Sequence, residues 1–292
     1  MMKVAVSSYS FSQAYRDGRI TLMDSIAKAK EMGFDGFEVV DFNFKTACPE
    51  GKSLEDFARE IKAEADRVGI TITNYTVGAD FQNRDTAEEV ARVKKEVDIA
   101  VILGASGMRH DAASWDRSKK YESFDHALPR MAEGIRQVAE YAASKGVRTM
   151  SENHGFFAQD ALRVEKLMNA VGHPNYGWLV DMGNFTCADE NPFISVGIAA
   201  PYAVYVHAKD FIIKPADGPN PGRFFFKSRA GAFLRGTIVG QGNVPVKACL
   251  AALKNNGYDG FVAIEFEGME DCFLALEAGL ENLRRYIKEL ED

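Results

Sequence analysis

A short phrase that nearly repeats constrains the fold of this chain more than any other feature of its sequence. Met32–Val40 reads MGFDGFEVV, and Asn256–Glu267 reads NGYDGFVAIEFE. In both places an amphipathic segment comes first, a glycine ends the helical pattern, and the apolar run that follows is typical of a buried strand. The same helix-to-strand joint therefore occurs near both ends of the chain.

Weaker copies of this joint lie between the two, and two further apolar runs bring the number of candidate strands to eight. Most of them begin about 30 residues apart, as repeated strand-loop-helix units require. The segments that contain them are Lys3–Tyr9, Met32–Val40, Glu64–Val77, Val97–His110, Ala139–Asn153, Met168–Asn184, Ala203–Asp210 and Asn256–Glu267. Eight such units favour an α/β fold of the (β/α)8 TIM barrel type over an open, doubly wound sheet.

Composition is consistent with one enzyme-sized domain. The chain has 292 residues, 46% of them hydrophobic, and no linker or low-complexity stretch divides it. Such a chain can bury a large core. We therefore expect a single TIM-barrel domain over residues 1–292.

The interval between the last two candidate strands is longer than the others. Residues 211–243 are rich in Gly and Pro and carry five basic side chains among five phenylalanines. Long loops of this kind are usually functional covers or mobile segments, so this insertion is either a lid over a substrate or a surface excursion that contacts another subunit. The GQG within it is better explained as a plain turn before a helix than as a phosphate loop.

The net charge and the cysteines indicate which classes of binding partner and which cellular compartment to expect. The formal net charge of −7 gives no general attraction to nucleic acid or anionic lipid. The sequence shows no apolar run of membrane-spanning length and no signal-peptide pattern at its start. Its four cysteines are isolated, which suits a reducing compartment. We expect a cytoplasmic protein that acts without membrane or nucleic acid, either as a monomer or as a homo-oligomer.

Ionisable side chains stand where several candidate strands end. In a β/α barrel the carboxyl ends of the strands and the loops after them form the active site. The side chains found there are Glu38, His110, Glu152, His154, Asp181, His207, Lys209, Glu265 and Glu267. Glu152 and His154 are two residues apart, so they are expected to face the same side.

Each of these residues has an ordinary structural interpretation when it is taken alone. Asp181 can cap the next helix, a histidine can be hydrogen-bonded in the core, and Glu265 can be a solvated loop residue. Taken together, however, three carboxylates buried at one place would repel one another strongly without a cation. Three carboxylate oxygens and one imidazole suit Mn²⁺, Mg²⁺ or Co²⁺ better than a closed structural zinc site.

Four motifs make a family resemblance visible. ENHG, VDMGN, VHAKD and IEFEG begin at residues 152, 180, 206 and 264. In this order and spacing they resemble the xylose-isomerase-like TIM barrel superfamily of sugar isomerases and epimerases, whose relatives include tagatose and psicose 3-epimerases, hydroxypyruvate isomerase and inosose dehydratase. The resemblance covers essentially the whole chain. It implies one bound divalent metal ion, with Mn²⁺ first and Mg²⁺ or Co²⁺ as alternatives, ligated by Glu152, Asp181, His207 and Glu265.

The chain also departs from its relatives. Several epimerases and the related apurinic endonucleases carry a histidine three residues after the sixth-strand aspartate, where this chain has Asn184. An asparagine side chain can hydrogen-bond a hydroxyl but does not exchange protons near neutral pH. Glu38 stands where the endonucleases have a further metal-binding histidine, so a trinuclear site is not expected.

The resemblance implies removal of a proton from the carbon next to a carbonyl, through an enediolate that the metal stabilises. Glu152 and Glu265 are the expected general bases. The leading interpretation is an isomerase or epimerase acting on a ketose or sugar phosphate. The alternative is a dehydratase or lyase acting on a keto-sugar or inosose, including elimination from 3-keto-glycosides; a sugar-binding barrel without turnover is the third possibility. The expected substrate contacts are His154, His110, Lys209, Arg235 and Glu38, with either histidine as the acid for a leaving group.

Overall fold

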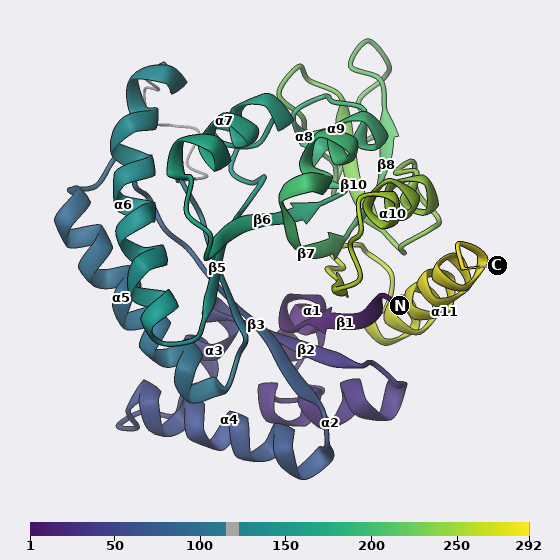
Figure 1. The fold of residues 1–292 in the computed structure, drawn as a ribbon. Coiled ribbons are helices and arrows are strands. Elements are labelled where there is room, and N and C mark those ends of the chain that lie inside the picture. The colour runs from purple at the N-terminus through teal and green to yellow at the C-terminus, as the bar shows by residue number, and fades with distance from the viewer. Residues whose placement is uncertain (115–122, 292) are drawn as a thin grey trace.

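The computed structural model of this chain describes residues 1–114 and 123–291. Eight parallel strands form a closed barrel with helices around it (Figure 1). In chain order these strands are β1 (Lys3–Ser7), β2 (Gly36–Val40), β3 (Thr71–Val77), β4 (Gly107–His110), β5 (Arg148–Glu152), β6 (Tyr176–Asp181), β7 (Ala203–Ala208) and β11 (Phe261–Ile264). The predicted TIM barrel is confirmed.

The outer layer consists of one longer helix after nearly every strand and several short helices in the loops. The longer ones are α2 (Leu22–Met32), α4 (Leu54–Val68), α5 (Thr86–Leu103), α6 (Phe124–Ser144), α7 (Ala161–Val171), α9 (Pro192–Ala199), α10 (Val246–Asn255) and α11 (Cys272–Glu289). The short ones are η1 (Ser8–Phe11), α1 (Ser12–Arg16), α3 (Asp41–Ala47), α8 (Asn184–Cys187) and η2 (Ala200–Tyr202). Side-chain caps fix where many of them begin, as Thr21, Ser53 and Asp85 do for α2, α4 and α5.

The repeated phrase is the predicted joint between a helix and a strand. Gly33 ends α2 with a left-handed φ of 94°, a conformation that favours glycine, and β2 begins three residues later at Gly36. A Cβ atom on Gly36 would lie 2.3 Å from Thr73 Cγ2 of β3, so only glycine allows the two strands to approach. In the second copy, Gly257 takes the left-handed φ, at 83°.

The core has an outer and an inner part. Most buried apolar side chains lie between the barrel and its helices. A small second cluster, made of Ala5, Met150, Leu179, Tyr205 and Ala263, comes from the barrel strands themselves. Four of these five stand two residues before Glu152, Asp181, His207 and Glu265. Because strand side chains alternate in direction, the apolar cluster forms one layer of the barrel interior and the ionisable residues form the next.

The long interval after β7 is largely ordered. It contains a three-stranded antiparallel sheet made of β8 (Asp210–Lys214), β9 (Phe226–Lys227) and β10 (Phe233–Thr237). Asp210 is 1% exposed, and its carboxylate accepts backbone N–H groups of Gly240, Gly242 and Val244. The amides of the GQG segment therefore already bind a carboxylate, which agrees with a turn and leaves no cradle there for a phosphate.

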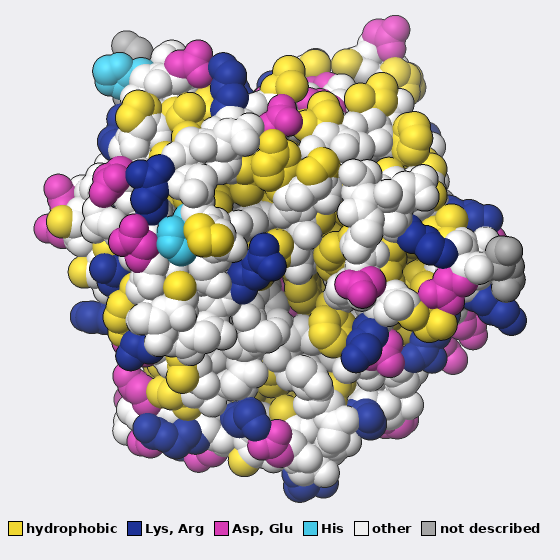
Figure 2. All heavy atoms as spheres, in the orientation of Figure 1, with side chains coloured by type: hydrophobic (Ala, Val, Ile, Leu, Met, Phe, Trp, Pro, Cys, Tyr) yellow, Lys and Arg dark blue, Asp and Glu magenta, His cyan; other side chains and the backbone are white. Residues whose placement is uncertain are grey.

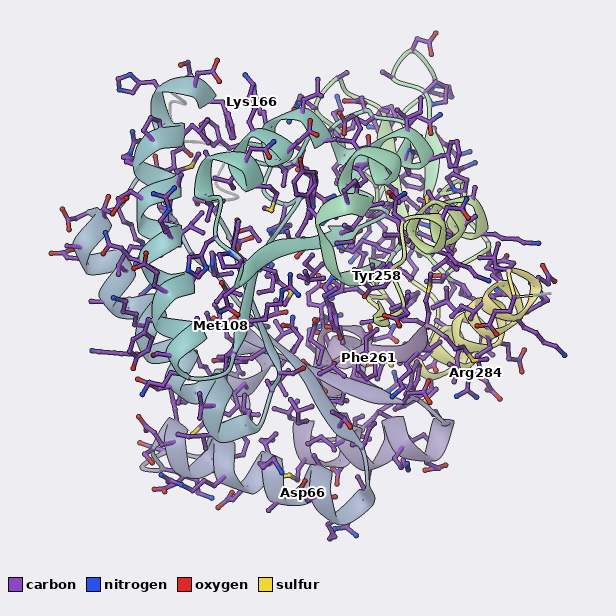
Figure 3. The ribbon with its side chains drawn as sticks, viewed as in Figure 1. Asp66, Met108, Lys166, Tyr258, Phe261 and Arg284 are labelled. Carbon is purple, nitrogen blue, oxygen red and sulfur yellow. The ribbon has the colours of Figure 1, made fainter. Side chains whose placement is uncertain are left out.

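The surface is of mixed charge. Figure 2 shows Lys and Arg side chains interspersed with Asp and Glu over the visible face. In Figure 3, Asp66 and Arg284 lie on the outer helices α4 and α11, whereas Phe261 at the start of β11 lies toward the centre. Among the described residues, no helix combines the length and the apolar character needed to span a bilayer.

Candidate metal centre

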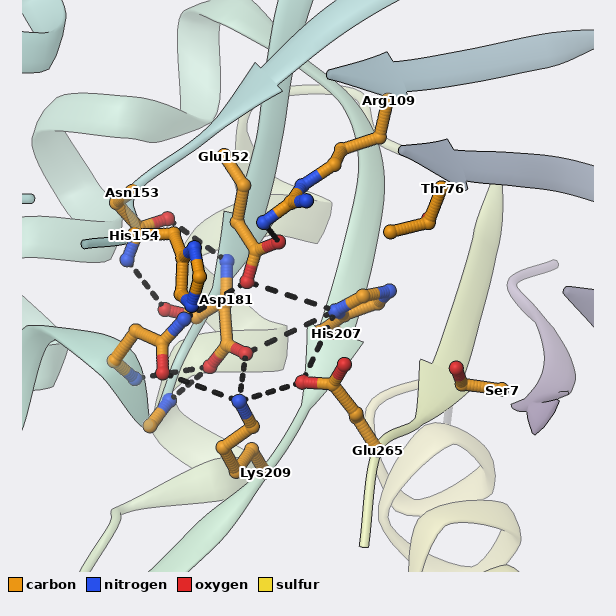
Figure 4. A network of polar contacts seen from close by, with 12 residues as sticks. Ser7, Thr76, Arg109, Glu152, Asn153, His154, Asp181, His207, Lys209 and Glu265 are labelled. Carbon is orange, nitrogen blue, oxygen red and sulfur yellow. Dashed lines mark hydrogen bonds and ion pairs between the residues drawn. The ribbon is translucent and has the colours of Figure 1, made fainter. Parts of the chain in front are cut away.

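The four residues implied as metal ligands meet at the carboxyl ends of neighbouring strands. Glu152 ends β5, Asp181 ends β6, His207 lies in β7, and Glu265 follows β11 directly. One ligand atom from each side chain lies within 4.8 Å of the others. Figure 4 shows all four pointing toward one another inside the barrel mouth. The closed parallel sheet brings them together because it places all its strand ends on one side.

The nitrogen that faces the carboxylates is Nδ1 of His207. It lies 3.6 Å from Glu265 Oε2 and 3.8 Å from both Glu152 Oε1 and Asp181 Oδ2. These separations are too long for hydrogen bonds, and this buried Nδ1 has no hydrogen-bond partner in the part of the chain that the structure describes. They are comparable with the spacing of two ligands on one cation with bonds of about 2.1 Å. The donor set and the unpartnered nitrogen therefore fit a divalent metal ion.

Glu38 holds the same imidazole from the other side. His207 Nε2–H donates to the Glu38 carboxylate, with distances of 3.0 and 3.1 Å to its two oxygens, and Asn74 Nδ2 donates to Glu38 Oε2 at 2.9 Å. When the imidazole is neutral, this arrangement leaves the lone pair on Nδ1. Glu38 is 0% exposed. The structure does not favour the expected substrate contact of Glu38, because its carboxylate is enclosed behind His207.

The charge around His207 favours a cation. Burial by itself would lower the pKa of His207, but the carboxylates of Glu38 and Glu265 raise it well above its usual value. Burial also raises the pKa of Glu152, against the opposing effect of Arg109. The raised pKa of His207 indicates that the carboxylates favour further positive charge here, although Arg109 and Lys209 also pair with them.

A second chain of contacts runs outward from Glu152 and includes two residues that the sequence interpretation missed. Arg109 Nη2 lies 2.7 Å from Glu152 Oε2 and 2.8 Å from Asp111 Oδ1. His154 Nδ1 lies 2.9 Å from the same Asp111 oxygen. Burial opposes a charge on His154, but Asp111 raises the pKa of this imidazole above its usual value. His154 is therefore a half-buried proton donor beside the cluster.

His110 does not belong to this group. Its ring lies between Phe81 and Tyr176, with centroids 5.6 and 6.1 Å away, and its Nδ1–H donates to the Asp111 carbonyl. It is 0% exposed, and burial lowers its pKa to about 4. This buried position does not favour the expectation that His110 contacts substrate or protonates a leaving group. Strand alternation indicated only that one of the two residues faces the barrel interior, because Arg109 and His110 are neighbours on β4 and point to opposite sides.

Asn184 and Lys209 connect the carboxylates. Asn184 Nδ2 donates to Glu152 Oε1 at 2.8 Å, and Lys209 Nζ lies 2.5 Å from Glu265 Oε2 and 3.1 Å from Asp181 Oδ2. The other Asp181 oxygen accepts the backbone N–H groups of Gly183 and Asn184. The position where several relatives carry a histidine is thus used here to hold two carboxylates in place.

Asn153 fixes the strand that carries Asp181. Its Oδ1 accepts the Asp181 backbone N–H and the Trp178 indole N–H, and its Nδ2 donates to the Asp181 carbonyl. Because Asn153 follows Glu152 directly in sequence, these bonds fix the position of Asp181 along the barrel axis relative to Glu152.

Arg235 is placed differently from the expectation. It lies in β10, where Nη2 is 3.2 Å from Glu270 Oε1 and the guanidinium lies over the Phe225 ring at 5.9 Å. An ordinary ion pair thus accounts for this residue.

A cavity of about 730 Å³ lies at the end of the barrel opposite the metal cluster, against Arg148, Tyr176 and Gly260. Strands begin at this end, so the cavity is not the opening of the metal cluster.

Comparisons with known proteins agree with the fold. The family model described as xylose isomerase-like TIM barrel matches residues 26–290. A curated inosose dehydratase from Clostridium botulinum is 29% identical over 175 residues, which is 58% of this chain and 57% of the relative, so the match spans little more than half of that protein.

Two solved structures illustrate the shared fold. One, described as IOLI protein with a binding zinc atom, has a TM-score of 0.78 at 15% identity and covers 99% of both chains. An L-ribulose 3-epimerase structure has a TM-score of 0.74 at 15% identity and covers 100% of this chain and 96% of its own. At this level of identity the likeness concerns the fold alone.

Proposed function

The chain belongs to the family of xylose isomerase-like TIM barrels, and from this premise we propose that it is a divalent-metal-dependent dehydratase of a polyhydroxylated ketone, such as a keto-cyclitol or keto-sugar. The observation that carries the proposal is the buried, unpartnered Nδ1 of His207, facing three carboxylates at the barrel mouth. Glu152, Asp181, His207 and Glu265 are the residues that would hold the ion. The ion would supply Lewis acidity toward a carbonyl oxygen, which acidifies the neighbouring C–H bond.

Glu265 is the proposed general base. Its side chain is 12% exposed, against 3% for Glu152, whose two oxygens are bound by Asn184 and Arg109. Burial alone would favour the neutral acid, but Lys209 and His207 hold the pKa of Glu265 well below its usual range. Glu265 is therefore ionised at neutral pH, while its lowered pKa makes it a weaker base than a free carboxylate.

His154 is the proposed general acid. Its side chain is 35% exposed and its ring is held by Asp111. In the proposed elimination the carbon next to the carbonyl gives its proton to Glu265, the bond to the β-hydroxyl breaks, and a carbon–carbon double bond forms. The departing hydroxyl takes a proton from His154 and leaves as water.

Elimination takes precedence over the isomerase and epimerase interpretation for two reasons. Several curated relatives bear the name inosose dehydratase. In addition, His154 beside the cluster can donate the proton that a leaving hydroxyl requires. Lys209, Arg109 and Arg235 are all paired with carboxylates, which favours an uncharged substrate over a sugar phosphate.

Epimerisation is the second candidate. It is favoured by the positions of Glu152 and Glu265, each less than 4 Å from the same His207 nitrogen but on different strands, as two opposed bases require. The enclosure of Glu152 by Arg109 and Asn184 argues against it.

One experiment separates these activities. The protein is incubated with Mn²⁺ in D₂O with an inosose, a 3-keto-glycoside and a ketohexose, and the products are followed by mass spectrometry. Loss of water from one substrate is expected, and His154→Gln should retain deuterium exchange while losing elimination. Exchange into recovered substrate without elimination would favour epimerisation instead. Absence of both signals with every substrate would contradict an enzyme of this class.

A further inference from the structure

The ammonium of Lys209 lies against the same oxygens that a metal ion would use. Nζ is 2.5 Å from Glu265 Oε2 and 3.1 Å from Asp181 Oδ2, and these two atoms also face His207 Nδ1, at 3.6 and 3.8 Å. Figure 4 shows Lys209 reaching the cluster from the side opposite Arg109. The ammonium of Lys209 and a bound metal ion would therefore both contact the carboxylates of Asp181 and Glu265.

Burial and packing fix the position of the Lys209 ammonium. Lys209 is 5% exposed, and its third polar neighbour is Asn184 Oδ1 at 3.2 Å. Gly183, in the turn after β6, packs on the lysine stem: a Cβ atom there would lie 2.8 Å from the Lys209 carbonyl oxygen and 3.0 Å from its Cγ. A lysine is almost never buried this deeply unless its charge is paired.

The charges require a cation at this place in every state of the protein. Asp181 and Glu265 lie with Glu152 in one buried cluster, and Glu267 Oε2 is a further 3.8 Å from Lys209 Nζ. Several buried carboxylates at such distances repel one another strongly. An ammonium at 2.5 Å relieves this repulsion, but it also repels a divalent ion bound to the same two residues.

We propose that Lys209 is the internal counter-ion of the metal centre: its ammonium neutralises Asp181 and Glu265 in the metal-free protein and thereby weakens the affinity of the four ligands for the metal. This inference rests on the metal site of the proposed function but not on the reaction. Lys209 thus keeps the apoprotein folded and the bound ion exchangeable.

The test measures metal affinity and not turnover. Lys209→Met and Lys209→Gln remove the charge, and Mn²⁺ is titrated calorimetrically into chelator-treated protein. Both variants should bind Mn²⁺ at least about tenfold more tightly than the wild type. Their metal-free forms should unfold at a lower temperature, and saturating Mn²⁺ should raise the unfolding temperature more than it does in the wild type.

Lys45→Met is the matched control. Lys45 Nζ pairs with Glu96 Oε1 at 2.7 Å, and neither residue belongs to the cluster. Its Mn²⁺ affinity should equal that of the wild type.

The outcomes distinguish the proposals. If the wild type binds no divalent ion, the metal site fails and this inference fails with it. If the wild type binds Mn²⁺ but the Lys209 variants bind it equally or more weakly, the counter-ion role alone is overturned. Variants that fold only with Mn²⁺ support it, whereas variants that remain unfolded at saturating Mn²⁺ overturn it, because the ion then cannot replace the lysine.

Discussion

Glu38 holds the imidazole of His207 across the barrel interior, with its two carboxylate oxygens 3.0 and 3.1 Å from Nε2. The two residues are 169 positions apart in sequence and come from β2 and β7, strands that are not neighbours in the barrel. The contact selects the tautomer with its lone pair on Nδ1. A glutamate that touches neither solvent nor the other ligands thereby determines which nitrogen faces the cluster.

Replacing Glu38 should weaken the metal site without unfolding the protein. In Glu38→Gln the carboxylate charge that fixes the Nε2–H tautomer is lost, so Mn²⁺ affinity should fall by about 10- to 100-fold. Calorimetric titration of Mn²⁺ into the chelator-treated variant measures this affinity. Glu96→Gln is the control, since this buried glutamate accepts a bond from Tyr75 and is not part of the cluster. Equal Mn²⁺ affinity in Glu38→Gln and the wild type would remove Glu38 from the centre.

Replacing Glu265 should abolish turnover. The amide of Glu265→Gln is nearly the same size but accepts no proton, so kcat should fall by at least about a hundredfold at saturating Mn²⁺. Turnover is measured by loss of water from the active substrate, and circular dichroism verifies the fold. Activity near that of the wild type would show that another residue is the base.

Arg109 is expected to matter for stability because it compensates two buried acids. Arg109→Met leaves Glu152 and Asp111 without the guanidinium, and breaking a buried ion pair in this way should cost about 3–5 kcal/mol of unfolding free energy. Arg59→Met is the comparison, because Arg59 and Asp56 form a pair with 62% and 63% exposed side chains that should contribute less than about 1 kcal/mol. Urea unfolding of both metal-free variants gives the two values. Similar losses would mean that the Arg109 contacts are weak.

His110 should make stability depend on pH. Burial lowers its pKa from 6.5 to about 4, so the unfolded chain binds a proton at higher pH than the folded chain does. This contribution to the unfolding free energy is fully present above the unfolded pKa and is lost as the pH falls toward the folded pKa; it amounts to at most about 3 kcal/mol.

The comparison of His110→Phe with the wild type isolates this effect. The variant keeps an aromatic ring between Phe81 and Tyr176 but has no group that titrates. Urea unfolding at about pH 7 and about pH 4.5 should show the wild type losing more stability than the variant on acidification. An identical loss in both proteins would show that folding leaves the pKa of His110 unchanged.

The sequence by itself determined the barrel and indicated ionisable residues at its mouth, among which the family resemblance singles out four. Glycine-terminated helices followed by apolar runs identify strand-loop-helix units, and Glu152, Asp181, His207 and Glu265 stand where such runs end. Because all strands of a parallel barrel end on one side, local patterns were sufficient to expect these side chains in one place.

Only the tertiary structure decided which neighbours serve that centre. The side of β4 that faces inward depends on its register with β3 and β5, so the sequence did not distinguish Arg109 from His110. The bond from His207 to Glu38, the pairing of Arg235 with Glu270 and the antiparallel sheet after β7 all join residues far apart in the chain. Such contacts depend on strand register and the direction of side chains across the barrel, which no local pattern of residues encodes.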